Sequence, residues 1–444
     1  MFPEMPKVLI VSVRFPPYNN MASIRLGKLA KYLNEFGWEP WVLTVEKDLI
    51  ESVGNLPVEI DENHVIRAGY CWPLCWLVGY NRRTNNAESE FKRDEEAGER
   101  VGEPPIKSRK PFYRWLVGHL RHTRWPDQGM PWRRRAITRG RILLKEHNFD
   151  IIFSSHGPPS SHVVASALAR HFRLPWVADF RDLWSLNHIV RRKGLAQMVE
   201  AWFERRVLRF ADALTTVSEP LAGQLQGLHE KPTTVIMNGF DEEDYRHLKD
   251  RPDKRLFVIS YTGMIYEGKQ DPRILFEAVR SFNETRDGTE FPIEVRFYGT
   301  KPAHLERIID DYGVSEWVKI FPRVSYQEAT RVQVEADALL LLEWNDPSAA
   351  GVYTGKVFEY IGARKPILAV GPEGGVIEEL LLKTKSGCLA KNCGAALTAL
   401  REWVQMKKSI GTTRLKTDPK LIRPYTRRHQ AGILAGLLDR ALGR

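Results

Sequence analysis

Short apolar runs alternate with segments of helical spacing along most of the chain. In the first half the runs hold few charged residues, and the segments between them place apolar residues three and four positions apart. Buried apolar strands that alternate with helices form parallel sheets, so the pattern predicts an α/β protein. The strands predicted in this half cover residues 7–13, 41–45, 150–155, 175–179, 213–218 and 234–237.

The same alternation restarts after residue 255. Ser325-Tyr-Gln-Glu328 has the pattern of a capping box, which predicts a helix N-terminus at that point. The chain of 444 residues also exceeds the size at which a single core stops growing, about 250–300 residues. Two doubly wound domains are therefore expected. The further strands are predicted at 255–263, 293–298, 318–321, 338–342 and 366–370.

The domain limits follow from these elements. We expect an N-terminal domain over 1–240, a C-terminal domain over 241–425, and a last helix over 426–444 that packs back on the first domain. Residues 81–110 are dense in charge and poor in large apolar groups, so a mobile insertion is expected over about 81–130. Ligands of doubly wound sheets bind at the carboxyl ends of strands, and the cleft between the two facing domains is the expected site.

The first helix and the loop before it exclude one class of enzyme. Ser23 is expected to cap this helix, and Gly37 is expected to end it. The loop that leads into the helix has no glycine before Gly27. The glycine-rich dinucleotide fingerprint is therefore absent, which argues against a nicotinamide-dependent dehydrogenase.

Composition and net charge limit the classes of partner that the protein can be expected to bind. Hydrophobic residues make up 43% and charged residues 27%, as in ordinary globular enzymes, and 66 Lys and Arg against 55 Asp and Glu leave a net charge of +11. This excess favours nucleotide phosphates, anionic lipid headgroups or nucleic acid as partners. No apolar run has the ~20 residues of a transmembrane helix, and the first predicted strand has no leader before it, so a cytosolic protein is expected. The four cysteines, at 71, 75, 388 and 393, lack zinc-site spacing and are expected to be free thiols.

Residues 106–145 are the most basic stretch, with twelve Lys or Arg against Asp127 alone. Trp115, Trp125 and Trp132 are interleaved with this charge. Basic charge with interfacial aromatic residues is typical of a segment that lies on an anionic membrane surface. The same pattern also suits an ordinary solvated helix face, and less well single-stranded nucleic acid. Membrane contact is the interpretation we favour.

The segment from Gly351 to Gly371 has the pattern of a phosphate-binding loop. Thr354 and Gly355 precede a short predicted helix, whose first backbone N–H groups and positive dipole end can hold an anion. Lys356 adds a positive charge, and Glu359 lies one turn further on as a hydrogen-bond acceptor. A diphosphate and a ribose would fit this pairing of an anion site with a carboxylate. An ordinary turn between strand and helix is the alternative.

Three other strand ends carry candidate residues. Gly263 and Lys269 follow the first strand of the second domain, where the glycine allows close approach and the lysine can reach a phosphate. His156 follows the strand at 150–155 and can hydrogen-bond a sugar hydroxyl or a phosphate, or be a structural histidine. Arg181, between Asp179 and Asp182, is more typical of a structural ion pair.

With these residues on hand, the chain resembles the family 4 glycosyltransferases, which retain the anomeric configuration and have the GT-B fold of two Rossmann-like domains across a cleft. The resemblance extends from Val8 to about Leu442, except for residues 81–130. Its most specific segments are Thr354-Gly-Lys-Val-Phe-Glu-Tyr360 with Lys365-Pro-Ile-Leu368, Tyr261-Thr-Gly-Met-Ile-Tyr266 with Gly268-Lys269, and Asn238-Gly-Phe-Asp241. The opening Phe15-Pro-Pro17 with Arg25 is similar to members that act in surface polysaccharide assembly.

The resemblance implies a role for each matching residue. Glu359 would hold the donor ribose, Gly355 with Thr354 and Lys356 would meet the diphosphate, and Lys269 would neutralise its charge. His156 would contact the donor sugar near the reacting carbon. The remaining assignments place Gly263, Arg323 and Val324 on the donor and Asn20, Arg25 and Arg181 on the acceptor side.

The chain departs from the family pattern at two positions. The first of two motif glutamates would fall at residue 351, which is Gly351, and the phosphate-binding arginine after the strand glycine is Met264. Asp346 or Glu343 are the candidate substitutes for the missing glutamate.

The implied function is transfer of a hexosyl or related sugar from a nucleoside-diphosphate-sugar donor to a glycan or lipid-linked acceptor. Such an enzyme would act in polysaccharide or cell-envelope synthesis at the inner face of the membrane, without a metal or other cofactor. A sugar-nucleotide epimerase of the same fold is the alternative enzyme. A basic nucleic-acid-binding protein is the non-enzymatic alternative.

Overall fold

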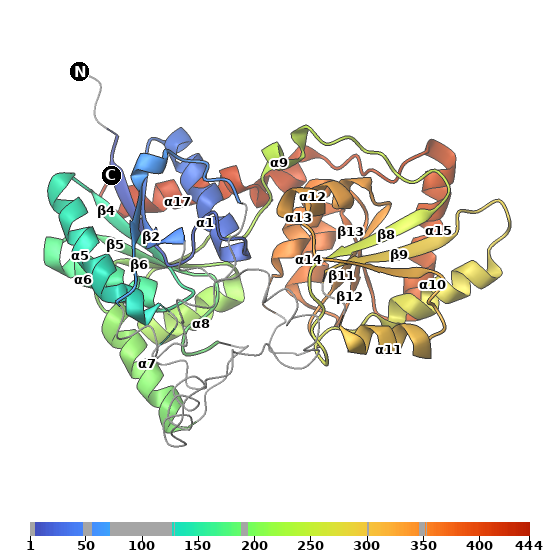
Figure 1. Ribbon diagram of the computed structural model, residues 1–444, viewed down its shortest axis with the longest axis horizontal. Helices are drawn as coiled ribbons and strands as arrows, with labels where there is room; N and C mark the ends of the chain where they lie inside the picture. Colours follow the sequence, from blue (N-terminus) through green and yellow to red (C-terminus); the bar gives the residue numbers. More distant parts are fainter. Residues whose placement is uncertain are drawn as a thin grey trace. The chain divides into compact units, whose positions relative to one another are not determined.

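The computed structural model divides the chain into two compact units. Unit 1 comprises Met1–Met237 with Arg427–Arg444, and unit 2 comprises Asn238–Thr426. Each unit contains one sheet with helices on its faces (Figure 1). The structure describes residues 5–47, 56–71, 127, 129–187, 194–299, 302–345, 351 and 353–444. Most of the insertion predicted over 81–130, together with Cys75, Trp115, Trp125 and Asp346, lies outside these residues.

Unit 1 is a seven-stranded sheet in the order β3-β2-β1-β4-β5-β6-β7, and all its paired strands run parallel. Its strands are β1 (Lys7–Val11), β2 (Glu39–Val45), β3 (Val65–Ala68), β4 (Ile151–Ser155), β5 (Trp176–Phe180), β6 (Ala213–Thr216) and β7 (Thr233–Val235). Its helices are α1 (Met21–Leu33), α5 (Met130–Glu146), α6 (Ser160–Phe172), α7 (Leu195–Leu208), α8 (Glu219–His229) and α17 (Arg427–Ala441).

Unit 2 is a six-stranded parallel sheet in the order β10-β9-β8-β11-β12-β13. Its strands are β8 (Phe257–Thr262), β9 (Ile293–Tyr298), β10 (Val318–Phe321), β11 (Ala338–Leu342), β12 (Ile367–Val370) and β13 (Gly387–Ala390). Its helices are α9 (Glu242–Arg246), α10 (Arg273–Thr285), α11 (Ala303–Asp311), α12 (Tyr326–Glu335), α13 (Gly355–Ala363), α14 (Val376–Thr384), α15 (Cys393–Ile410) and α16 (Pro419–Ile422). The prediction of two doubly wound, Rossmann-like sheets is confirmed.

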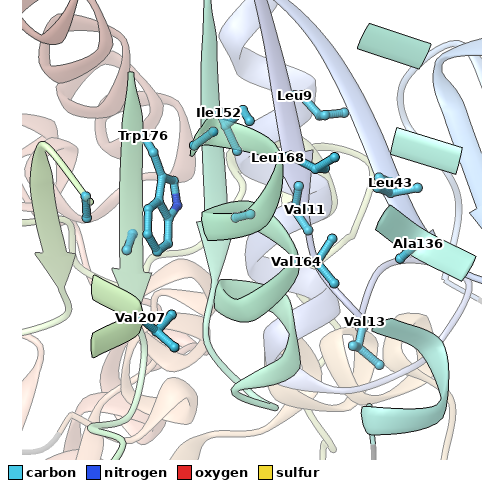
Figure 2. Close-up of a cluster of buried hydrophobic side chains, with 14 of the residues drawn as sticks. Leu9, Val11, Val13, Leu43, Ala136, Ile152, Val164, Leu168, Trp176 and Val207 are labelled. Carbon is cyan, nitrogen blue, oxygen red and sulfur yellow. The ribbon is translucent and has the colours of Figure 1, made fainter. Parts of the chain in front are cut away.

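The core of unit 1 lies on both faces of its sheet because successive strand residues point to opposite sides. Leu9 and Val11 of β1 pack toward α5 and α6, where Ala136, Val164 and Leu168 meet them (Figure 2). Val8 and Ile10 belong to the cluster on the other face, with residues of α1 and α17. In Figure 1 the C-terminal helix α17, in red, lies beside the N-terminal helix α1, in blue.

Two short strands were not predicted. β3 and β13 each have four residues, and three residues of β13 are only half-buried, so their hydrophobic signal is weak. The β3 segment, Val-Ile-Arg-Ala, also has a charged residue in its middle. Each is an edge strand that becomes ordered by pairing with a neighbour, which single-sequence periodicity does not reveal.

The cap of the first helix was also predicted wrongly. Asn20, not Ser23, is the N-cap of α1, and its side-chain oxygen accepts a hydrogen bond from the Ser23 backbone N–H at 2.8 Å. Ser23 itself is a buried helical residue. Asn20 had been assigned to the acceptor side, and this capping bond gives it a structural role. Gly37 does end the helical segment, in the left-handed conformation that glycine tolerates best.

Strand order places one topological switch point in each unit. In unit 1 the sheet grows from β1 toward β3 in one direction and from β4 toward β7 in the other. In unit 2 the corresponding change of direction lies between β8 and β11. Ligands of such sheets bind beyond the carboxyl ends of the strands at these points. His156 follows β4, and Gly263 follows β8, so both lie at a switch point.

A buried ion pair ties α1 to the sheet of unit 1. The guanidinium of Arg25 donates to the Asp179 carboxylate at 2.9 Å and to the backbone carbonyls of Ile236 and Met237, each at 2.8 Å. Both charged side chains are fully buried. Ser155 and Thr215 also donate hydrogen bonds to Asp179. Arg25 had been assigned to the acceptor side, but its guanidinium is enclosed by the fold and is not exposed to a ligand.

We expect Asp179→Ala to lower the free energy of unfolding by about 3–5 kcal/mol, because it leaves the Arg25 charge buried without its carboxylate. Denaturant unfolding followed by tryptophan fluorescence measures the loss. Asp182→Ala is the matched control: its ion pair with Arg181 is partly exposed and should contribute no more than about 1 kcal/mol. Similar losses in the two variants would contradict the structural role of the Arg25–Asp179 pair.

Candidate functional site

The switch point of unit 2 brings together the turn after β8 and the start of α13. Gly263 has φ +127°, a conformation that favours glycine, and a Cβ at this position would lie 2.6 Å from Cε of Lys356. The side chain of Lys356 therefore occupies the space that the missing Cβ leaves. Residues 93 positions apart in the sequence thus form one surface, and the two predicted donor-binding segments meet there.

Lys356 is held against Tyr261. Its ammonium donates to the Tyr261 hydroxyl at 2.6 Å and lies 4.1 Å from the centre of the ring. The Tyr261 hydroxyl in turn donates to the Met264 carbonyl at 2.8 Å. Burial lowers the pKa of Lys356 from 10.5 to about 8, and nearby Glu359 partly opposes this shift. A lysine whose charge is destabilised by burial gains from any anion that binds beside it.

The N-terminus of α13 has the geometry expected for anion binding. Thr354 is the N-cap with an extended backbone, and its side chain makes no capping hydrogen bond. Gly355 is the first helical residue and adds no side chain of its own there. Leading N–H groups of a helix have no intrahelical acceptor, which leaves those near Gly355 suited to a phosphate oxygen.

Glu359 lies on the same helix among buried polar groups. Gln333 of α12 donates to the Glu359 carboxylate at 3.4 Å and to the Thr262 hydroxyl at 2.9 Å. The Glu359 carbonyl accepts from the Tyr245 hydroxyl at 2.9 Å. Gln333 is almost fully buried, and its carbonyl oxygen has no hydrogen-bond partner among the described residues. Sequence patterns did not single out Gln333, because an isolated glutamine in a helix carries no motif.

Lys269 lies further along the segment that follows β8, after Gly263 and Met264. Its ammonium is 4.4 Å from the centre of the Trp344 ring. The backbone N–H of Asn345 donates to the Lys269 carbonyl at 2.8 Å, which ties this turn to the segment after β11. Met264, which stands where the family has an arginine, is 44% exposed. Arg323 and Val324 lie in the turn between β10 and α12, with Arg323 exposed.

Glu343 follows β11 directly. Burial raises its pKa to about 7, with a smaller contribution from the negative charge of Glu378. One of its carboxylate oxygens is buried without a hydrogen-bond partner among the described residues. Both observations fit a carboxyl group that is protonated near neutral pH and able to donate a hydrogen bond. Of the two substitutes for the missing glutamate, Glu343 is the one that the structure describes.

In unit 1, His156 lies at the switch point with both ring nitrogens unused. The ring is 8% exposed, and neither nitrogen has a hydrogen-bond partner within the described part of the chain. It stacks on Phe180 with ring centres 5.6 Å apart, and burial lowers its pKa. A neutral imidazole with two unsatisfied buried nitrogens costs free energy. A ligand that supplies a hydrogen-bond partner would offset that cost.

Other residues predicted to bind a ligand or a membrane make ion pairs or core contacts within the fold. Arg181 pairs with Asp182, in agreement with a structural ion pair, while Asp179 binds Arg25 instead. Trp132 of the basic stretch is fully buried and donates from its indole nitrogen to the Thr44 carbonyl. It therefore belongs to the core and was wrongly counted among the membrane-facing aromatic residues. Arg133 pairs with Asp127, and the exposed cations in the described part are Arg134, Arg135, Arg139, Arg141 and Lys145.

No group of three or more histidine, cysteine, aspartate and glutamate side chains suited to a metal ion occurs in the described ranges. Likewise, none of the helices described is both long and apolar enough to cross a bilayer.

Comparisons with known proteins bear on the fold and on the class of protein. Residues 91–244 match the family model described as Glycosyltransferase Family 4. No protein of curated function matches the sequence significantly. The fold is similar to a glycosyltransferase from Rickettsia africae ESF-5, with a TM-score of 0.58, 14% identity and 98% of each chain covered.

Two further solved structures share the fold. Sucrose-phosphate synthase from Thermosynechococcus elongatus has a TM-score of 0.56 at 12% identity, over 99% of each chain. HepE from Anabaena, solved in complex with UDP-glucose, has a TM-score of 0.52 at 13% identity, over 98% of each chain. At such identities the likeness establishes the GT-B fold. Together with the family match, it indicates that the protein is a transferase of the glycosyltransferase class.

We expect Gly263→Ala to displace the ammonium of Lys356, because the new Cβ would lie 2.8 Å from Nζ. The pKa of Lys356 should then rise from about 8 toward 10.5 as the ammonium reaches water. An NMR pH titration of ¹³C-labelled lysine Cε groups measures this. Gly268→Ala is the matched control, because it also changes a glycine with positive φ but has no atom within 4 Å of the added Cβ. An unshifted Lys356 titration in Gly263→Ala would disprove the contact.

Proposed function

We propose that the protein transfers a sugar from a nucleoside-diphosphate-sugar donor to a glycan or lipid-linked acceptor, with retention of the anomeric configuration. Unit 2 binds the donor, and unit 1 contributes the acceptor side and His156. The observation that carries the proposal is the packing of Lys356 against Gly263 and Tyr261, beside the open N-terminus of α13. This packing places a half-buried cation beside the leading N–H groups of a helix at a topological switch point, where a diphosphate would bind.

Each part of the donor nucleotide can be matched to groups around this packing. The diphosphate takes the N–H groups near Gly355 and the ammonium of Lys356, with Lys269 as a second cation. Glu359, oriented by Gln333, accepts hydrogen bonds from the ribose hydroxyls. The base lies at the Arg323–Val324 turn. Support for this arrangement comes from the resemblance to the family and from a fold shared with a protein solved with UDP-glucose.

The positively charged groups of the proposed site matter most during the transfer step. The bond between the anomeric carbon and the diphosphate oxygen breaks, and the acceptor oxygen bonds to that carbon on the same face. The acceptor proton passes to the departing diphosphate. Negative charge grows on the diphosphate as the bond breaks, so Lys269, Lys356 and the helix N-terminus stabilise the transition state more than the ground state. The helix end contributes about 0.3–2 kcal/mol, and the two lysines add to it.

Two residues, one in each unit, are candidates to bind the sugar. His156 is neutral and buried, and its unpaired nitrogens suit hydrogen bonds to a sugar hydroxyl. Glu343 replaces the missing family glutamate at Gly351 as a partner for the sugar hydroxyls. No metal is needed in this scheme, because the chain supplies the positive charge that a diphosphate requires.

We expect Glu359→Ala and Lys269→Ala each to reduce sugar transfer by orders of magnitude without unfolding the protein. A thermal-shift panel with UDP, GDP, ADP and their sugars identifies the donor, since a ligand at 100 times its Kd stabilises by about 2.7 kcal/mol. Transfer is then measured with that donor. Glu284→Ala, an exposed glutamate of α10, is the control and should leave transfer unchanged.

Three outcomes would refute the assignment. Wild-type transfer in both Glu359→Ala and Lys269→Ala would remove the proposed donor site. Stabilisation by none of the nucleotides would argue against any sugar-nucleotide enzyme. Conversion of a donor to its epimer with no acceptor present would show a sugar-nucleotide epimerase instead.

We expect nucleotide affinity to fall as the pH rises above about 8, the pKa of Lys356. Below that pH the lysine is already charged and binding takes up no proton. Above it, binding a diphosphate requires proton uptake, so affinity decreases by up to tenfold per pH unit. Calorimetric titration of the nucleotide identified above, from pH 7 to 9, measures the slope. Lys356→Met should bind more weakly at pH 7 and lose the slope, and an unchanged slope would exclude Lys356 from the phosphate site.

A further inference from the structure

Helix α7 of unit 1 has an apolar face that the fold does not use. Leu195, Met198, Val199 and Trp202 are exposed by 75%, 69%, 42% and 60%. Their spacing of three and four residues places them on one side of the helix. Single exposed apolar residues are normal on protein surfaces, but a contiguous row that includes a tryptophan is typical of an interaction surface.

The other side of α7 is firmly attached to unit 1. Val207 and Leu208 are buried in the core, and Phe203 packs edge-on against Trp184 with ring centres 5.7 Å apart. The buried Glu204 accepts a hydrogen bond from the Ser185 backbone N–H and pairs with His229. The anchored residues all lie in the second half of the helix. Figure 1 shows α7, in light green, with one end reaching beyond the sheet of unit 1.

Positive charge continues the apolar row toward the C-terminus of the helix. Arg205 and Arg206 are exposed, and the guanidinium of Arg206 lies 5.7 Å from the centre of the Trp202 ring. Arg209 and Arg170 each lie 4.3 Å from the centre of the Phe210 ring. Neither acidic residue of α7 is exposed, since Glu200 is partly buried and Glu204 is buried.

We propose that this face of α7 is a docking surface for an anionic lipid bilayer. Met198, Val199 and Leu195 enter the boundary between headgroups and acyl chains, and Trp202 lies at the headgroup level, where amphipathic rings are favoured. The arginines at 170, 205, 206 and 209 bind anionic headgroups. The proposal goes beyond the proposed function, because none of these residues is part of the donor site.

Charge decides between a membrane and other partners. A second copy of the chain would bring two molecules of net charge +11 and two arginine clusters together, and this repulsion opposes association. A nucleic acid would match the arginines but leave Leu195, Met198 and Val199 in water. An anionic bilayer is the surface that complements both the charge and the apolar row.

The surface differs from the one expected from the sequence. The basic stretch 106–145 was the predicted membrane contact, and its described part has exposed cations but a buried Trp132. In α5 the exposed apolar residue is Ile142, at 43%. Charge alone gives weak and salt-sensitive membrane binding, whereas charge beside an apolar face gives stable insertion. The segment 195–209 is therefore the docking surface that the described residues support, and the membrane contact predicted for 106–145 stays a prediction, because residues 106–126 lie outside the described ranges.

The test is flotation of the full-length protein with lipid vesicles. We expect binding to vesicles of phosphatidylcholine mixed with phosphatidylglycerol, and little binding to phosphatidylcholine alone. Arg205→Gln with Arg206→Gln should weaken binding about 25-fold, since each arginine near the surface contributes about fivefold, equivalent to ~1 kcal/mol. Met198→Ser with Trp202→Ser should weaken it at least tenfold, on the order expected for losing two buried apolar side chains.

Two matched variants control for general surface effects. Leu382→Ser with Ile410→Ser removes apolar side chains of unit 2 that are 68% and 58% exposed, and should bind vesicles as the wild type does. Arg139→Gln with Arg141→Gln removes two exposed cations of α5 and should have a smaller effect than the α7 arginine pair. Thermal shift with nucleotide should be unchanged in the α7 variants, so failure here is separable from failure of the proposed function.

Four results would overturn the proposal. The first would be a wild type that does not bind the anionic vesicles, and the second would be α7 variants that bind them as tightly as the wild type. The third would be loss of binding in the α5 pair instead. The fourth would be a wild-type dimer in light scattering that Met198→Ser with Trp202→Ser converts to a monomer, which would assign the face to a second copy of the chain.

Discussion

Parallel strand pairing is the constraint on which the rest of this protein depends. A parallel sheet buries both faces under helices, so chemistry is confined to the edge where the strands end. In each unit the chain reverses its direction of growth once, beside β1 and β4 in one sheet and beside β8 and β11 in the other. The candidate residues at these points, His156 and the Gly263 turn, are ordinary loop residues, and their position is what makes them candidates for ligand binding.

The two switch points satisfy their polar groups differently. In unit 1, Arg25 donates to Asp179 and two carbonyls and stabilises the fold. Neither ring nitrogen of the nearby His156 has a hydrogen-bond partner among the described residues. In unit 2, the ammonium of Lys356 contacts the hydroxyl and the ring of Tyr261, and burial destabilises its charge more than the nearby Glu359 stabilises it. Groups whose hydrogen bonds are complete support the structure. A buried group whose hydrogen bonds are incomplete within the described residues, such as His156, is a candidate for ligand binding.

Most of the elements were predictable, because strands of apolar residues between helices carry a strong periodic signal. Strands β9, β10 and β11 lie at their predicted positions, and Ser325 accepts the capping hydrogen bond expected of it. The misses are short or local: β3 and β13 are brief edge strands, and the cap of α1 is Asn20, because the helix begins at Met21, two residues before Ser23. Glu328 also binds Arg331 rather than closing the capping box.

The sequence by itself determined the fold class, the two repeats and the loops that hold glycine, lysine and glutamate, because these depend on local residue pattern. Tertiary structure decided which of these residues have partners. It buried Arg25 and Trp132, placed Gln333 beside Glu359, and exposed one face of α7. Such outcomes depend on contacts between residues far apart in the chain, and burial sets the pKa values of Lys356 and Glu343 only once those contacts exist.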